Sequence, residues 1–121
     1  MIELVIIDEG VFSIVKREMR RARLTETGGA LVGHHQGHYV VVTSASGPGP
    51  KAELRMHSVM IDGAHAERFC SKARRKSKGT EDYIGDWHCH LGYSLKPSKL
   101  DYNAMKTMAE FSSAQRVIPF R

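Results

Sequence analysis

Apolar residues recur along the chain with two different periods, one typical of strands and one of helices. Residues 2–7 are almost continuously apolar and rich in β-branched side chains, as in a strand buried on both faces. Asp8 then provides a helix N-cap, and from Val11 to Ala22 the apolar positions follow helical spacing, with arginines gathered near the end. The chain is therefore predicted to open with a strand followed by an amphipathic helix.

The next segment has the period of two that is typical of β-strands. Residues 25–33 form one predicted strand, residues 38–44 form a second, and residues 33–37 join them as a hairpin. Three histidines lie at or beside this hairpin, namely His34, His35 and His38. Because the tip of a short hairpin is exposed, we expect these side chains to face water and to form no metal site of their own.

A turn-rich break over residues 45–53 leads into the second half of the chain. Residues 54–61 are predicted to form a strand, and Asp62 then caps a helix with a narrow apolar stripe, made of Ala66, Phe69, Cys70 and Ala73. Basic residues crowd positions 72–78 at the end of this helix. A solvated helix end explains them more simply than a docking surface for an acidic partner.

Three more elements complete the predicted order: a strand over residues 83–90, a helix over residues 98–111, and a short strand over residues 114–120. Strands that alternate with helices favour an α/β fold with the sheet between helices. With 121 residues, of which 41% are hydrophobic, the chain suffices for a single domain over residues 1–121.

Composition adds few constraints on function. The two cysteines, Cys70 and Cys89, are too few for a disulfide framework, and strand alternation turns Cys89 away from its neighbouring histidines. With no leader and no long apolar span visible, we expect a cytoplasmic protein with no membrane partner. The net charge of +5 motivates a nucleic-acid-binding hypothesis, but a surplus of this size usually serves solubility.

The stretch from Asp86 to Asp101 carries the candidate chemistry. A strand ending in His88-Cys-His90 places both imidazoles on one face, about 6.6 to 6.8 Å apart along the strand. With Ser98 as the next N-cap, Asp101 heads the buried stripe of the following helix, and a buried carboxylate needs a cation or donors. Glu26 likewise begins an otherwise apolar strand row. Together these residues predict a metal site.

Each of these residues also has a simpler interpretation. Ser98-x-x-Asp101 is a helix-capping signature in its own right, and this role is compatible with a metal site. His88 and His90 considered alone are more simply explained as exposed or hydrogen-bonded histidines. Two imidazoles and one carboxylate suit both catalytic zinc and non-haem iron, and we favour zinc. Asp86 shares the histidine face and either supports a ligand or is a charge at a strand end.

The order and spacing of these residues closely resemble the JAMM motif of the JAB/MPN-domain metallopeptidases. The motif is His88-x-His90, seven residues, then Ser98-x-x-Asp101, with Glu26 upstream in Glu-Thr-Gly-Gly-Ala-Leu-Val-Gly. The resemblance implies that His88, His90 and Asp101 bind one zinc ion per chain. It also implies that Glu26 is the general acid and base and that Ser98 helps to stabilise the tetrahedral intermediate.

The segments 86–90, 47–51 and 98–105 look most like bacterial members encoded beside E1/E2-like genes, including the deubiquitinase-like JAMM peptidases of CBASS antiphage operons. This resemblance implies an isopeptidase that cleaves after the C-terminus of a ubiquitin-like protein, with a cyclic-nucleotide synthase as a conjugated target. A sulfur-carrier-protein peptidase and a non-catalytic MPN scaffold remain the alternatives. The chain departs from many relatives at Leu91, where they have proline, and in its shorter tail, which fits a truncated C-terminus.

The resemblance also implies the architecture: a three-layer sandwich with a curved mixed β-sheet flanked by helices, on a core shared in outline with the cytidine deaminases. Deaminase chemistry is not expected, because the Pro-Cys-x-x-Cys ligand pair of those enzymes is absent from the sequence. Whether the loop over residues 46–60 blocks the site before substrate arrives stays open.

Overall fold

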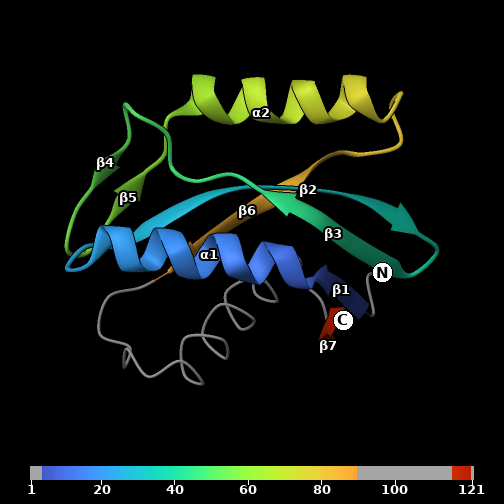
Figure 1. Ribbon diagram of the computed structural model, residues 1–121, viewed down its shortest axis with the longest axis horizontal. Helices are drawn as coiled ribbons and strands as arrows, with labels where there is room; N and C mark the ends of the chain where they lie inside the picture. The colour runs from blue at the N-terminus through green and yellow to red at the C-terminus, as the bar shows by residue number, and fades with distance from the viewer. Residues whose placement is uncertain (1–3, 90–115, 121) are drawn as a thin grey trace.

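A mixed five-stranded sheet forms the centre of the molecule (Figure 1). The computed structural model describes residues 4–89 and 116–120, so the helix predicted over residues 98–111 lies outside the described part. The strands are arranged in the order β6-β2-β3-β1-β7. Their bounds are Leu4–Asp8 for β1, Thr27–Gln36 for β2, Tyr39–Ala45 for β3, Asp82–Cys89 for β6 and Arg116–Phe120 for β7.

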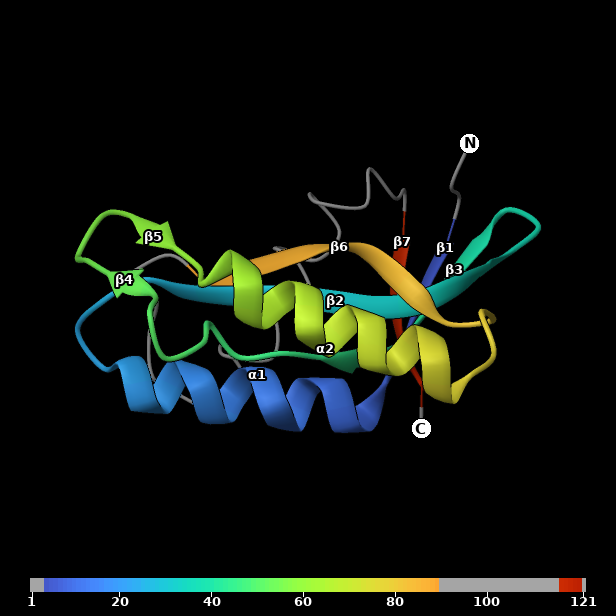
Figure 2. The same ribbon diagram turned by 90° about the horizontal axis from the view of Figure 1, so that it is seen from above.

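Two helices cover opposite faces of this sheet, α1 (Glu9–Ala22) on one side and α2 (Gly63–Lys76) on the other, as Figures 1 and 2 show. Both begin at the predicted N-caps: Asp8 accepts a hydrogen bond from the Gly10 amide, and Asp62 accepts one from the His65 amide. The predicted three-layer α/β sandwich is therefore confirmed, and a protein whose sheet has a helix on each face can bury apolar residues on both.

The sheet is parallel on one side and antiparallel on the other. Strand β1 pairs in parallel with β3 and β7, whereas β2 pairs antiparallel with β3 and β6. Pairing shifts by a residue within β2 against each neighbour, and Gly85 in β6 has φ near 149°, in the region that favours glycine. Such irregularities bend and twist strands, which accounts for the predicted curvature.

The two faces of the sheet carry separate hydrophobic clusters. The larger one joins α1 to β1, β2, β3 and β6, and its biggest side chain is Trp87, which is 2% exposed. The smaller one joins β2 to α2 through Ala30, Val32 and Cys70, with partly buried residues of the predicted α2 stripe around them. Strand β1 differs from the prediction of burial on both faces, because Leu4 and Ile6 are only partly buried.

Two local predictions were wrong. Strand β2 continues through His34 and His35 to Gln36, so the turn is confined to Gly37 and His38, and His34 lies beside Glu81 instead of at a tip. The strand predicted over residues 54–61 is a small hairpin of β4 (Glu53–Leu54) and β5 (Val59–Met60), closed by a hydrogen bond from the Arg55 amide to the Ser58 carbonyl. A pattern of apolar residues at every second position is the same in one strand and in two short paired strands, so it did not predict the reversal of chain direction.

The loop that precedes this hairpin is fastened at both ends. The buried Ser46 carbonyl accepts a 2.9 Å hydrogen bond from Trp87 Nε1, and its hydroxyl accepts one from the Ala30 amide. At the other end, the Asp62 amide donates to the Pro48 carbonyl at 2.8 Å. Hydrogen bonds to the sheet and to the N-cap of α2 therefore hold this loop in place.

Neither described helix has the length and apolar character needed to cross a bilayer.

Candidate metal centre

The pairing of β2 with β6 fixes which candidate residues share a face. His88 lies opposite Gly28 and Asp86 lies opposite Ala30, so both face the α2 side of the sheet, where Ala30 belongs to the smaller cluster. Cys89 lies opposite Thr27, and like Trp87 it packs on the α1 side. The structure thus places His88 and Asp86 on one face, as strand alternation predicted.

Glycine at position 28 allows β2 and the His88 strand to approach closely. A Cβ atom at Gly28 would lie 2.6 Å from the Trp87 carbonyl oxygen and 3.3 Å from His88 Cβ. Real side chains do not tolerate the first of these distances, so any larger residue would push the strands apart. Gly28 therefore keeps the space beside His88 free of a side chain from β2.

Glu26 lies immediately before β2, at the edge of the same region. The residue is only 9% exposed, and its backbone amide donates a 2.8 Å hydrogen bond to the Arg55 carbonyl in the β4–β5 turn. A carboxylate held with so little exposure requires polar or charged neighbours. This hydrogen bond connects the backbone of the 46–60 segment directly to Glu26, the predicted general base.

Cys89 is poorly suited to act as a nucleophile. Burial raises the pKa of its thiol to about 11, and the neighbouring Glu26 carboxylate contributes in the same direction. A thiol with this pKa stays protonated at neutral pH, and the thiolate is the reactive form. Because the Glu26 carboxylate raises the pKa of Cys89, it lies near the end of β6, the strand that carries His88.

Asp86 has described neighbours on the α2 side of the sheet. Burial raises the pKa of Tyr83, and the Asp86 carboxylate beside it raises it further. Burial and the carboxylates of Asp82 and Asp86 likewise raise the pKa of the Cys70 thiol. These contacts account for Asp86 without a metal, so its predicted supporting role remains a prediction.

Three predicted site residues, His90, Ser98 and Asp101, lie outside the described residues. Within residues 4–89 and 116–120, no group of three or more His, Cys, Asp or Glu side chains is placed to hold a metal ion. The described part contributes one predicted ligand, the His88 imidazole on β6, and the predicted base, the buried Glu26 carboxylate immediately before β2. An imidazole nitrogen is a donor that suits zinc and a carboxylate suits proton transfer beside it, so the described residues fit the predicted centre.

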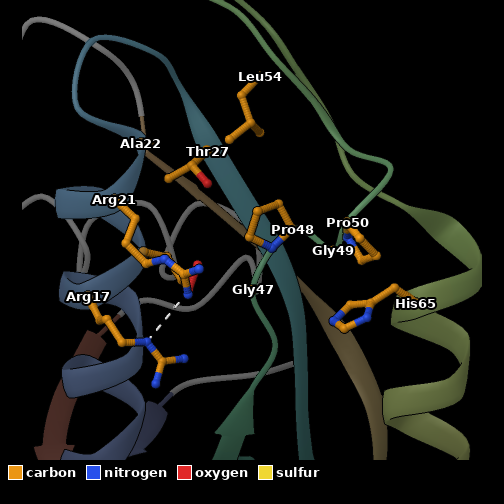
Figure 3. Close-up of a pocket in the computed structure, with 11 residues that line it drawn as sticks. Arg17, Arg21, Ala22, Thr27, Gly47, Pro48, Gly49, Pro50, Leu54 and His65 are labelled. Carbon is orange, nitrogen blue, oxygen red and sulfur yellow. Dashed lines mark ion pairs between the residues drawn. The ribbon is translucent and has the colours of Figure 1, made fainter.

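The structure also shows a pocket that the sequence analysis did not identify. It has a volume of about 560 Å³ and lies between α1, the 47–50 loop and the first turn of α2 (Figure 3). Glu18, one of its lining residues, is a buried carboxylate. The burial of Glu18 could have been predicted from the sequence, because Glu18 follows Val11 by two helical turns and so belongs to the buried stripe of the helix.

Comparison with known proteins supports both the fold and the family resemblance. The family described as prokaryotic homologs of the JAB domain matches residues 8–118, which is most of the chain. In a solved structure, the solution structure of protein DSY2949 from Desulfitobacterium hafniense, the fold superposes with a TM-score of 0.60 at 18% identity, over 80% of this chain and 64% of that one. The resemblance drawn from the sequence motif is therefore confirmed.

Three relatives of known name are similar to this chain. The "CD-NTase/cGAS isopeptidase" of Escherichia coli is 29% identical over 81% of this chain and 63% of its own length, and that of Vibrio cholerae is 31% identical over 67% and 52%. The "probable metalloprotease y4qB" of Sinorhizobium fredii is 27% identical over 98% of this chain and 74% of its own length. The chain thus spans between about half and three quarters of these relatives.

Proposed function

Because the chain belongs to the family of prokaryotic homologs of the JAB domain, we propose that it is a zinc-dependent isopeptidase that hydrolyses the amide bond after the C-terminus of a ubiquitin-like protein. The observation that carries the proposal is the position of the buried Glu26 carboxylate beside the end of the strand that carries His88. Glu26 immediately precedes Thr27, whose partner across the sheet is Cys89, the residue that follows the first histidine of the His-x-His motif.

The proposed ligands are His88, His90 and Asp101. A zinc ion held by them would activate a water molecule and polarise the scissile carbonyl. Glu26 has the chemistry to accept the proton that the attacking water loses and to return it to the leaving amine. Ser98, at the predicted helix N-terminus, is proposed to donate a hydrogen bond to the oxyanion of the tetrahedral intermediate.

The names of the relatives motivate the proposed substrate. Two of them are called CD-NTase/cGAS isopeptidase, which supports a conjugated cyclic-nucleotide synthase as the target and a role in antiphage defence. The partners that we propose are therefore a ubiquitin-like protein, its conjugate and an E1/E2-like enzyme, in the cytoplasm. The chain covers 63% and 52% of the length of these two relatives.

The central experiment separates metal binding from proton transfer. Purified protein is expected to contain about one zinc ion per chain by elemental analysis. Glu26→Gln is expected to retain that zinc while cleavage of a ubiquitin-like fusion falls by at least about a hundredfold, because the amide cannot accept the proton. His88→Ala is expected to lose both zinc and cleavage. Glu53→Gln, an exposed carboxylate of β4, provides the matched control and should cleave normally.

Two results would contradict the proposal. If Glu26→Gln cleaved as fast as the parent protein, Glu26 would have no part in proton transfer. If the purified protein bound no zinc and cleaved no fusion, yet still bound a ubiquitin-like protein, the non-catalytic MPN scaffold would be the correct function.

A further inference from the structure

The pocket between α1 and the 47–50 loop has features of a ligand site, and none of its described lining residues belongs to the predicted metal centre. Its volume of about 560 Å³ lies within the range of roughly 300–1,000 Å³ typical of small-ligand sites. Figure 3 shows Arg17 and Arg21 projecting from α1 towards the loop that carries Pro48, with Thr27 and Leu54 farther along the cavity. Thr27, which lies opposite Cys89, faces the α1 side of the sheet, whereas His88 faces the α2 side.

Thr27 provides the first sign that this pocket receives a polar ligand. The residue is 1% exposed, and its hydroxyl oxygen is buried without a hydrogen-bond partner among the described residues. Leaving a buried hydroxyl unpaired is unfavourable, and native proteins rarely do so without a reason. Since Thr27 lines the cavity, a ligand acceptor inside it would satisfy this donor.

The charges around the pocket indicate the sign of the ligand. Arg17 Nε and Arg21 Nη1 lie 3.6 and 3.5 Å from the same oxygen, Glu18 Oε2, while the Glu18 side chain is 9% exposed. Two guanidinium groups therefore surround one carboxylate, which leaves one positive charge in excess. Each guanidinium has five N–H donors, so both keep donors for another acceptor. A singly charged anion fits this balance better than a phosphate dianion, which the buried Glu18 would repel.

The wall opposite the arginines is preformed. A Cβ atom at Gly47 would lie 2.9 Å from the Glu18 carboxyl carbon, so a side chain at this position would displace the carboxylate. Gly49 has φ of +93°, and the Pro48 carbonyl accepts a hydrogen bond from the Asp62 amide. Pro48 and Leu54 add apolar surface to a wall that needs no ordering when a ligand binds.

We propose that this pocket binds a carboxylate carried by a peptide, with Arg17 and Arg21 contacting the carboxylate and the Thr27 hydroxyl donating to an oxygen of the ligand. The cavity extends past the arginines to Leu54, which gives room for the residue that precedes the acidic group. The proposal does not depend on a metal or on peptidase activity, so it stands or fails separately from the function proposed above.

The test is an NMR titration of the full chain, following the backbone amides of Thr27, Gly47 and Arg21. The probes are acetyl-Leu-Glu-amide, its neutral partner acetyl-Leu-Gln-amide, and acetyl-Leu-Leu with a free terminal carboxylate. The glutamate peptide, the free-terminus peptide or both should shift these amides at millimolar concentration, and the neutral peptide should not. The two acidic probes tell a side-chain carboxylate from a chain terminus.

Two variants and one control sharpen the result. Arg21→Gln leaves Glu18 paired with Arg17, and it should weaken binding of the acidic peptide about tenfold. Thr27→Val should weaken binding severalfold while raising the urea midpoint, because it removes an unpaired buried hydroxyl. Arg75→Gln, on the exposed side of α2, removes an equal charge elsewhere and should leave binding unchanged.

Several outcomes would overturn the proposal. These are equal binding of the neutral and acidic peptides, equal weakening by Arg75→Gln, binding of acetate as strong as that of the peptides, or no shift at the pocket amides. Unchanged peptide affinity in a Thr27→Val protein with a raised urea midpoint would show that the hydroxyl is only an unfavourable buried group and takes no part in binding.

Discussion

Under α1, eleven buried residues of the described chain form one cluster, from Val5 to Trp87, whereas under α2 the cluster has three, Ala30, Val32 and Cys70. Cys70 is the sole buried residue of α2, although the helix has as many residues as α1. The difference teaches that the α1 face supplies most of the apolar burial that stabilises the fold. The α2 face, lined with small residues, is where His88 and Asp86 lie.

Removing a large side chain from each face tests this difference most strongly. Trp87→Ala should lower the free energy of unfolding by about 3–5 kcal/mol, because it empties the α1 cluster and removes the donor to the Ser46 carbonyl. Phe69→Ala in α2, where the side chain is only partly buried, should cost about 1–2 kcal/mol. Urea denaturation of both variants measures the two values, and equal losses would contradict an uneven core.

Adding one methyl group to β2 tests the space beside the histidine strand. Gly28→Ala should destabilise the fold by about 1–3 kcal/mol, because the new Cβ atom would meet the Trp87 carbonyl at 2.6 Å. It should also shift the His88 ring resonances in NMR spectra. Gly63→Ala is the control, since a Cβ there meets nothing within 4 Å. Undisturbed His88 resonances would show that the close approach of the strands does not position the imidazole.

Ser46 connects β2 to the loop that follows β3, and removing its hydroxyl should have an effect similar in size to that of Gly28→Ala. In Ser46→Ala the buried Ala30 amide loses its 2.9 Å side-chain partner, which should cost about 1–3 kcal/mol. Hydrogen exchange should show faster exchange at the Ala30 amide. Ser71→Ala, a partly exposed position on α2, serves as the control. Unchanged exchange at Ala30 would mean that another group replaces the hydroxyl.

The smallest expected effect is a pH dependence at the edge of the α2 face. The Arg74 guanidinium, 3.0 Å from Asp82 Oδ1, lowers the pKa of Asp82 below its usual value of 3.8. A lowered pKa stabilises the folded state above the unfolded value, and this stabilisation disappears as the pH falls through the folded pKa. Asp82→Asn and Arg74→Gln should therefore both flatten the loss of stability below about pH 4 in acid titrations. A parent protein with no such loss would contradict the assignment.

The sequence predicted the layered fold because each main element has a clear period and each described helix has a capping residue. Asp8 and Asp62 cap the helices as predicted, and Trp87 and His88 alternate between faces as a strand requires. The prediction failed where polarity misled it. His34 and His35 continue a strand despite being polar, since β3 lies alongside to pair with them.

The candidate site was only partly accessible to the same reasoning. The apolar row that begins at Glu26 and the motif resemblance predicted that His88 and Glu26 belong to one site. The structure describes Glu26 immediately before β2 and His88 on the neighbouring strand, and the joint site remains a prediction. The pocket at Thr27 was missed because its lining comes from helix, strand and loop segments that are far apart in sequence. Only the tertiary fold brings Glu18 against Gly47, and no local pattern records that contact.

The parallel pairing of β1 with β7 has a consequence for the order of folding. Leu4 pairs with Tyr39 on one side and with Arg116 on the other, so one strand makes both a contact of moderate range and one that closes nearly the whole chain. Closing a longer loop costs more chain entropy, and contacts of long sequence separation form slowly. We therefore expect the β2–β3 hairpin and α1 to assemble first, and β7 to add as the last and most readily released strand.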